Sequence, residues 1–115
     1  MIGIDLVAID RIASFVERHG DLALERFLSA DEIALANGRS ETIAGFWAAK
    51  EAVSKALGCG ICARLGFHDI AIIKDSAGAP HAVLSDRAFA HFGVSEIAVS
   101  ITHEKTHAAA VAILR

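Results

Sequence analysis

The order of apolar and polar residues predicts a chain that opens with a strand, continues with helices and closes with strands. Along residues 2–9 the even-numbered positions share one face of a strand, and Gly3, Asp5 and Val7 share the other. Residues 106–114 are almost wholly apolar, which favours a strand covered on both faces. Helices in one half and strands in the other are typical of an α+β fold.

Capping residues mark where the helices begin. Asp10 can cap the first helix, Ser29 and Glu32 make a capping box for another, and Ser40 can cap the longest, residues 41–57. The predicted helices are residues 10–19, 22–27, 29–36, 41–57 and 85–92.

Turns separate the remaining segments into strands. Glycines punctuate a loop at residues 58–66, and residues 75–80 form a turn between two strands. The predicted strands are residues 2–9, 68–73, 81–84, 96–103 and 106–114. No repeat, low-complexity tract or linker interrupts the pattern. We therefore expect a single domain, residues 1–115, with a small antiparallel sheet, one long helix and several short helices.

The composition adds an expectation about assembly. Hydrophobic residues make up 54% of the 115 residues, which is high for a chain that leaves much of its surface exposed. No apolar run approaches the roughly 18–20 residues that a membrane-spanning helix needs, and no secretory leader precedes the first strand. We expect a soluble cytoplasmic protein that does not enter a membrane and buries its apolar excess in a homo-oligomer.

Charge and cysteine content narrow the function classes. The net charge of −3 argues against a nucleic-acid partner, because binding a phosphate backbone normally requires a basic face. Cys59 and Cys62 form a lone C-x-x-C that follows a helix, whereas a redox motif of the thioredoxin type begins one. A zinc site would need two further ligands. We interpret the two cysteines as incidental.

Two carboxylates are candidates for chemistry. Asp5 lies in an apolar strand, where a structural role would pair it with Arg11 or a backbone cap. Glu51 shares a helix face with Lys55, and its structural alternative is an exposed ion pair worth about 0.3–0.5 kcal/mol. A carboxylate from a strand and one from a helix can hold Mg²⁺, which completes its octahedron with water and phosphate oxygens. A lysine beside such an ion would neutralise phosphate charge.

Three further residues have a structural and a functional interpretation. His103 ends a predicted strand and can be a hairpin residue without function. Arg11 and Arg18 are seven residues apart and share a helix face, which is either a solvated face or a docking surface for an acidic partner.

Three segments, taken together and in register, resemble the AcpS-type 4′-phosphopantetheinyl transferases. The first comprises residues 3–7 (GIDLV) and 10–12 (DRI), which look like the family's opening motif. The second comprises residues 46–52 (FWAAKEA) and 54–58 (SKALG), similar to its F-x-x-K-E-A block. The third is residues 99–103 (VSITH) with the apolar strand that follows.

The resemblance implies roles for the residues of these segments. Asp5 and Glu51 match the family's metal carboxylates, which hold Mg²⁺ against the pyrophosphate of coenzyme A. Lys55 matches the lysine that contacts this pyrophosphate, and His103 matches a histidine near the phosphates at the subunit boundary. These four form the expected catalytic set. Lys50 belongs to the K-E-A block and is expected to support the site as a cofactor-binding residue.

The resemblance also implies how substrates bind. Gly58, Gly60 and Pro80 match loops that line the coenzyme A cleft. Arg11 and Arg18 match basic positions that dock the acidic recognition helix of acyl carrier protein. The family is a homotrimer with active sites between protomers, which would account for the apolar excess.

Some positions depart from the family pattern. Phe46 stands where many members have an arginine that helps to hold the nucleotide phosphate of the coenzyme, and Ala79 replaces a frequent lysine. Cys59 stands where threonine is usual. Arg39 or Arg64 is expected to compensate for the missing cations.

The implied reaction moves 4′-phosphopantetheine from coenzyme A to a serine of apo acyl carrier protein, in fatty acid biosynthesis. The serine hydroxyl attacks the β-phosphorus and adenosine 3′,5′-bisphosphate leaves, with Glu51 or a metal-bound water as the base. Two alternatives stay open. One is a non-catalytic coenzyme A-binding module, which the weakened basic cleft would favour; the other is the same transfer onto a polyketide or peptide-synthetase carrier.

Overall fold

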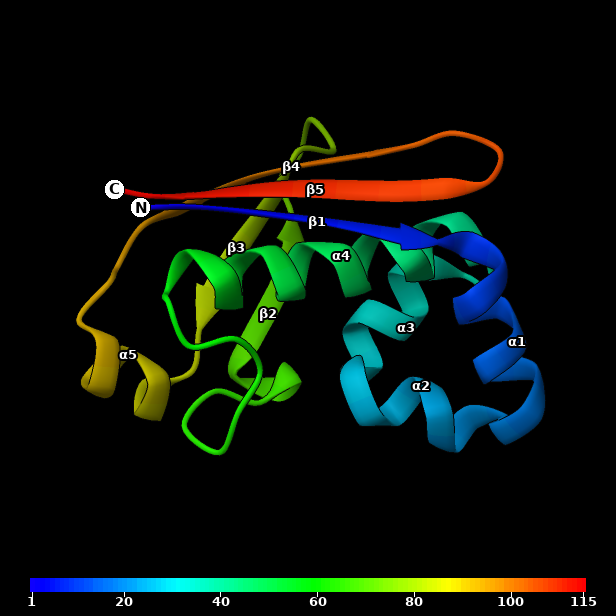
Figure 1. The fold of residues 1–115 in the computed structure, drawn as a ribbon, viewed down its shortest axis with the longest axis horizontal. Coiled ribbons are helices and arrows are strands. Elements are labelled where there is room, and N and C mark those ends of the chain that lie inside the picture. Colours follow the sequence, from blue (N-terminus) through cyan, green and yellow to red (C-terminus); the bar gives the residue numbers. More distant parts are fainter.

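The computed structural model describes residues 1–115, and most of its helices lie below a single sheet (Figure 1). In chain order the elements are β1 (Ile2–Ala8), α1 (Ile9–His19), α2 (Asp21–Phe27), α3 (Ala30–Ala36), α4 (Ser40–Ala56), the 3₁₀ turn η1 (Phe67–Asp69), β2 (Ile70–Lys74), β3 (Pro80–Leu84), α5 (Asp86–Phe92), β4 (Ile97–His103) and β5 (His107–Leu114). None of the helices combines the length and the apolar character needed to cross a bilayer.

The five strands form one antiparallel sheet in the order β1-β5-β4-β3-β2. Asp5 of β1 lies opposite Ala110 of β5, and Ala110 lies opposite Ile101 of β4. The first and last strands of the chain are therefore neighbours, and its two ends lie together at one end of the molecule (Figure 1). The α+β class and the antiparallel sheet are as the sequence predicted.

Helix α4 packs along β1, β5 and β4, and small residues let it come close to the sheet. A Cβ atom on Gly3 of β1 would lie 2.0 Å from the carbonyl oxygen of Ala52, and one on Gly45 would lie 2.9 Å from Cγ2 of Ile101. Because such contacts would push the helix off the strands, the two glycines fix how closely α4 sits on the sheet. This spacing brings side chains of β1 within reach of the second half of α4.

A buried ion pair joins α4 to the short helices. The Lys50 ammonium donates to Glu32 Oε1 at 2.7 Å and to the carbonyl oxygens of Phe27 at 2.7 Å and Phe67 at 3.2 Å. Glu32 also accepts from the backbone N–H of Ile72 and from that of the residue that caps α3. Burial lowers the pKa of Lys50, and the hydrogen bond and charge of Glu32 oppose this shift. The pair ties α2, α3, η1 and β2 to α4.

The outer face of β1 is uncovered. Ile2, Ile4 and Leu6 are each 67% exposed, whereas the alternate residues face α4. In β5 the alternate alanines that face α4 are buried, and no helix lies over the other face (Figure 1). The prediction that the last strand is covered on both faces is therefore wrong for a single chain, and the sheet presents an apolar outer surface.

Three helices, α1, α2 and α4, begin one residue earlier than predicted. Helix α1 starts at Ile9 with Ala8 as its N-cap, because β1 runs directly into the helix, and Asp10 lies in the first turn instead of capping it. Ser40, predicted as the cap of the longest helix, is the first residue of α4 and follows Arg39.

The strand predicted from residue 68 begins at Ile70, because Phe67–Asp69 form a 3₁₀ turn. Asp69 accepts from the N–H of Gly66 and stabilises this turn. The capping box at the start of α3 is confirmed, with both of its reciprocal hydrogen bonds formed.

Candidate active site

Asp5 lies on the face of β1 that meets α4, where it pairs with a lysine. Lys55, in the last turn of α4, donates from Nζ to Asp5 Oδ1 at 2.9 Å and to the carbonyl oxygen of Ile4 at 3.1 Å. The side chain of Asp5 is 14% exposed and that of Lys55 is 51% exposed. The carboxylate is thus largely withdrawn from water, while the ammonium remains free to turn toward a ligand in solution. Asp5 pairs with Lys55 and not with Arg11, the structural alternative considered from the sequence.

Glu51 lies one helical turn before Lys55 and shares the surroundings of Asp5. Partial burial, followed by the negative charge of Asp5, raises the pKa of Glu51, and the charges of Lys55 and Arg11 oppose this rise. The structure therefore brings the two carboxylates singled out in the sequence into one electrostatic environment. Like charges placed together favour either a proton or a cation between them.

The donor chemistry of this pair fits Mg²⁺. The cation takes oxygen ligands and commonly binds through one or two carboxylates, with water and substrate phosphates completing the octahedron. The chain has no group of three or more histidine, cysteine or acidic side chains that could enclose an ion. Asp5 and Glu51 offer two carboxylates, the number that Mg²⁺ commonly takes from a protein when phosphate oxygens and water supply its other ligands.

The predicted docking residues flank a groove beside Asp5, Glu51 and Lys55, which together form the carboxylate cluster. Arg11 and Arg18 of α1 line a hollow of about 190 Å³ together with apolar side chains of α1 and Trp47 of α4. Arg11 is close enough to Glu51 for its charge to influence the pKa of that carboxyl group. The groove thus combines positive charge with an apolar lining and lies next to the carboxylates.

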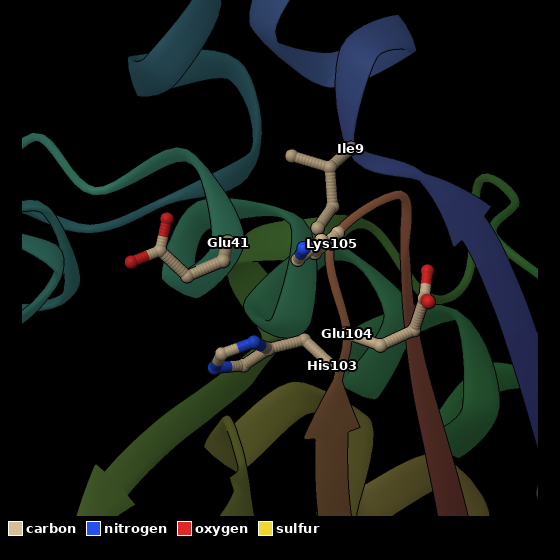
Figure 2. A pocket seen from close by; sticks show the side chains of 5 residues that line it. All are labelled: Ile9, Glu41, His103, Glu104 and Lys105. Carbon is tan, nitrogen blue, oxygen red and sulfur yellow. The ribbon is translucent and has the colours of Figure 1, made fainter.

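His103 lies at the end of β4, on a different part of the surface. Together with Ile9, Glu41, Glu104 and Lys105 it lines an open hollow of about 680 Å³ (Figure 2). The imidazole and the Glu41 carboxylate project to the same side of this hollow, whereas the Glu104 carboxylate points the other way (Figure 2).

The expected catalytic set is therefore divided within one chain. His103 lies beside Glu41 in the first turn of α4, while Glu51 is ten residues further along the same helix. At a rise of 1.5 Å per residue the two positions are about 15 Å apart along the helix axis. Asp5, Glu51 and Lys55 come together, and His103 does not join them.

The residues expected to line the coenzyme cleft are divided in the same way. Pro80 lies with His103 in a cleft of about 210 Å³ between the start of α4 and the β2–β3 turn. Gly58 and Gly60 lie at the opposite end of α4, with φ angles of 86° and 67° that favour glycine. The N–H of Gly58 donates to the carbonyl oxygen of Lys55 at 3.0 Å, which ties this loop to the carboxylate cluster.

The cleft around Pro80 contains residues that the sequence interpretation missed. Lys74, at the end of β2, and Thr42, in the first turn of α4, both line it. Lys74 lies directly opposite Pro80 in the β2–β3 pair. Its position beside the predicted turn was the one available signal, and no motif includes it.

One sequence interpretation needs correction. Lys50 is 1% exposed and its three ammonium hydrogen bonds are all made to the protein, so it supports the fold and cannot contact a bound cofactor directly. Arg39 donates from Nε and Nη2 to the carbonyl oxygens of Ala36 and Leu35, and its side chain is exposed. The expectation that Arg39 or Arg64 compensates for the missing cations stays a prediction.

The chain matches known proteins along nearly its whole length. Residues 1–112 match the 4′-phosphopantetheinyl transferase superfamily. The holo-[acyl-carrier-protein] synthase of Wolinella succinogenes is 59% identical over 111 residues, which cover 96% of this chain and 93% of that protein. The corresponding synthase of a Sulfurovum species is 50% identical and covers 98% of this chain and 94% of its own.

Solved structures of the same kind share the fold. Helicobacter pylori holo-[acyl-carrier-protein] synthase in complex with coenzyme A is similar at a TM-score of 0.97 and 45% identity, with both chains covered completely. A holo-(acyl-carrier-protein) synthase from Bacillus anthracis in complex with CoA (3′,5′-ADP) has a TM-score of 0.82 at 34% identity, and the match covers 98% of this chain and 93% of that one.

Proposed function

The chain belongs to the 4′-phosphopantetheinyl transferase superfamily, and from this we propose that it is an enzyme that moves 4′-phosphopantetheine from coenzyme A to a serine of apo acyl carrier protein. The observation that carries the proposal is the convergence of Asp5, Glu51 and Lys55, in a fold that a coenzyme A-bound synthase shares over its full length. The serine oxygen forms a bond to the β-phosphorus, and adenosine 3′,5′-bisphosphate leaves.

Each residue of this cluster has a part in the proposed transfer. Asp5 and Glu51 hold Mg²⁺, which when bound supplies positive charge to the pyrophosphate. Lys55 leaves its ion pair with Asp5 and neutralises a phosphate oxygen, which its exposed ammonium is free to do. Partial burial and, after it, the charge of Asp5 raise the pKa of Glu51, and a divalent cation held by these carboxylates would relieve the repulsion between them.

His103 serves, in this proposal, an active site completed by a neighbouring chain. His103 lies near Glu41 at the start of α4, about 15 Å along the helix axis from Glu51, so it does not act with the carboxylates of its own chain. It also lines an open hollow. A homotrimer is the assembly proposed. The uncovered isoleucine and leucine side chains of β1 support it, because burying each contributes about 1.5–3 kcal/mol, and the sheet leaves three of them exposed.

The oligomer has a direct test. Light scattering after size-exclusion chromatography should give three times the chain mass for the natural protein. Ile4→Glu should give monomers, since it places a charge in the apolar face of β1, whereas Leu22→Glu on exposed α2 should leave the mass unchanged. A monomeric natural protein would contradict the trimer without affecting the carboxylate assignment.

The carrier docks, in the same proposal, on the groove that Arg11 and Arg18 flank. Two guanidinium groups suit an acidic helix, and the apolar lining with Trp47 suits the side chains between its charges. Because the groove adjoins Glu51, a carrier bound there presents its serine to the carboxylate cluster. We also propose that the protein acts in the cytoplasm, in fatty acid biosynthesis, and that it consists of a single domain. The single domain is supported by matches that span 93% of the Wolinella succinogenes synthase and 94% of the Sulfurovum synthase.

The transfer assay separates this function from its alternatives. The protein is incubated with coenzyme A, Mg²⁺ and purified apo carriers, and the intact mass of each carrier is measured. A phosphopantetheine mass gain on the fatty-acid carrier supports the proposal. Gain only on a polyketide or peptide-synthetase carrier favours the second specificity, and coenzyme binding without any gain favours a non-catalytic module.

Variants of the two carboxylates test the metal assignment in the same assay. Asp5→Asn and Glu51→Gln should each reduce transfer by at least about a hundredfold, because either change removes a charged ligand. Glu17→Gln, an equivalent change on the exposed side of α1, should transfer normally. If either site variant turns over at a near-normal rate with saturating Mg²⁺, the carboxylates do not hold the ion.

A further inference from the structure

The loop between α4 and η1 carries two cysteines, Cys59 and Cys62, three residues apart. Both side chains are partly exposed and pack against the edge of the core. The N–H of Gly60 donates to the carbonyl oxygen of Ser54 at 3.1 Å, and the backbones of Cys62 and Leu65 pair with each other. The loop is thus held in a defined turn between Cys59 and Leu65.

The two thiols have different chemical surroundings. A hydrogen bond from the backbone of Arg64, followed by weaker contributions that include the Arg64 charge, lowers the pKa of Cys62. Burial raises the pKa of Cys59, whose thiol donates to the carbonyl oxygen of Gly60 at 3.0 Å. Each thiol is also close enough to shift the pKa of the other. A partly exposed thiol with a lowered pKa, three residues from a less acidic thiol, suits an exchange in which the first sulfur attacks and the second resolves.

We propose that Cys59 and Cys62 form a reversible intramolecular thiol–disulfide site that a low-molecular-weight disulfide closes. The Cys62 thiolate attacks one sulfur of the incoming disulfide, whose S–S bond breaks, and one small thiolate leaves. The Cys59 thiolate then attacks Sγ of Cys62 and displaces the second small thiolate. The two protons lost by the protein thiols are taken up by the two released thiolates, so one disulfide is reduced as another forms.

Several features of the loop suit this exchange. The chain contains two cysteines in all, so no third thiol can compete for either sulfur. Gly58 and Gly60, both at positive φ, supply the backbone freedom that a bridge between residues three apart requires. Cys59 follows Lys55 by four residues, and the N–H of Gly58 is bonded to the Lys55 carbonyl. The oxidisable pair therefore adjoins the helix turn that carries the candidate active-site lysine.

Intact-mass measurement tests the site without using enzyme activity. The reduced full-length protein is mixed with excess oxidised glutathione, quenched with acid and weighed. The natural protein should lose the mass of two hydrogens, retain no glutathione, and recover its mass after treatment with dithiothreitol. Cys59→Ser should retain one glutathione, because the mixed disulfide on Cys62 has no resolving thiol. Cys62→Ser should react several times more slowly than Cys59→Ser.

Three results would overturn the proposal. One is a natural protein that retains glutathione on its cysteines. Another is a protein that keeps two titratable thiols under conditions that load Cys59→Ser. The third is a disulfide-linked dimer on a non-reducing gel, which would mean that the sulfurs meet between chains. None of these results bears on phosphopantetheine transfer, so the two proposals fail separately.

Discussion

Replacing Lys50 with methionine tests whether the adjacent charges of the K-E-A block have separate roles. Methionine has a similar length and reach but carries no charge and donates no hydrogen bond. In the natural chain the ammonium makes hydrogen bonds to Glu32 and to two backbone carbonyls, and it is 1% exposed. The substitution therefore removes a buried cation and leaves its partner carboxylate in the core.

The magnitude follows from that stranded charge. Removing one member of a buried ion pair costs about 3–5 kcal/mol, and a domain of this kind has a total unfolding free energy of roughly 5–15 kcal/mol. After the change Glu32 still accepts hydrogen bonds from the backbone N–H groups of Ser29 and Ile72, so the cap of α3 and the link to β2 are kept. The ionised carboxylate, however, has lost the cation that paired with it. Adding Glu32→Gln removes the stranded charge and should recover part of the loss.

Urea denaturation at matched protein concentration measures the effect, with Lys55→Met as the control. Lys55 belongs to the same helix, but its exposed ion pair should change the unfolding free energy by less than about 1 kcal/mol. In the transfer assay the order should be reversed, with Lys55→Met affected more than Lys50→Met. Lys55→Met should lower transfer by roughly a hundredfold, and Lys50→Met, assayed where it is folded, should keep its KM for coenzyme A within about twofold.

Two outcomes would refute this reasoning. A loss of less than about 1 kcal/mol for Lys50→Met would mean that water or another group satisfies Glu32. A large rise in KM for coenzyme A with unchanged stability would mean that Lys50 binds the cofactor directly, as the sequence alone had suggested.

Two further predictions concern the supports of the site. Gly3→Ala should lower the unfolding free energy by about 3 kcal/mol or more, because its Cβ atom would lie 2.0 Å from the carbonyl oxygen of Ala52. Thermal denaturation measures the effect, with Gly66→Ala as the control, since a Cβ atom on Gly66 would lie 3.7 Å from its nearest neighbour. Equal melting temperatures for the two variants would contradict the close packing of α4 on β1. Arg87→Gln should cost about 1–2 kcal/mol at neutral pH, because it removes the hydrogen bonds from Nε and Nη2 to Asp69. Burial opposes ionisation of Asp69, but hydrogen bonds from Arg87, Ser85 and Gly66 outweigh it and hold the pKa of this carboxyl group below its usual value. A carboxyl group whose pKa is lower in the folded than in the unfolded protein stabilises the fold at a pH above the unfolded pKa near 3.9, and this stability is lost as the pH falls through the folded pKa. The difference in unfolding free energy between the natural protein and Arg87→Gln, measured in urea, should therefore shrink on acidification. A difference that stays constant with pH would contradict the ionised pair.

The sequence predicted the side of β1 on which Asp5 lies, because strand alternation separates it from Ile4 and Leu6. Family membership was also predicted and is confirmed by matches along the chain. The functions of Lys50 and Glu51 could not be told apart in the same way. Neighbouring residues on a helix point about 100° apart, and which of them is buried depended on Glu32, a residue of a different helix.

The position of His103 relative to Glu51 was equally beyond sequence reasoning. Both residues belong to motifs in register with the family, but the distance between them depends on which end of α4 meets the end of β4. Local patterns define a helix and a strand, and tertiary packing decides how they cross. The Mg²⁺ ligands, the homotrimer and the docking groove stay predictions that the experiments above address.

The pairing of β1 with β5 has a consequence for how the protein folds. Ile2 finds its partner in Ile113, almost the whole length of the chain away. Contacts between such distant residues slow folding, because a long loop must close before they form. Until β5 emerges from the ribosome, β1 has no partner strand, and the backbone groups that pair with β5 in the folded sheet are open to unwanted association. We therefore expect this protein to acquire its native sheet only after synthesis is complete, and to depend on chaperones when translation stalls near its end.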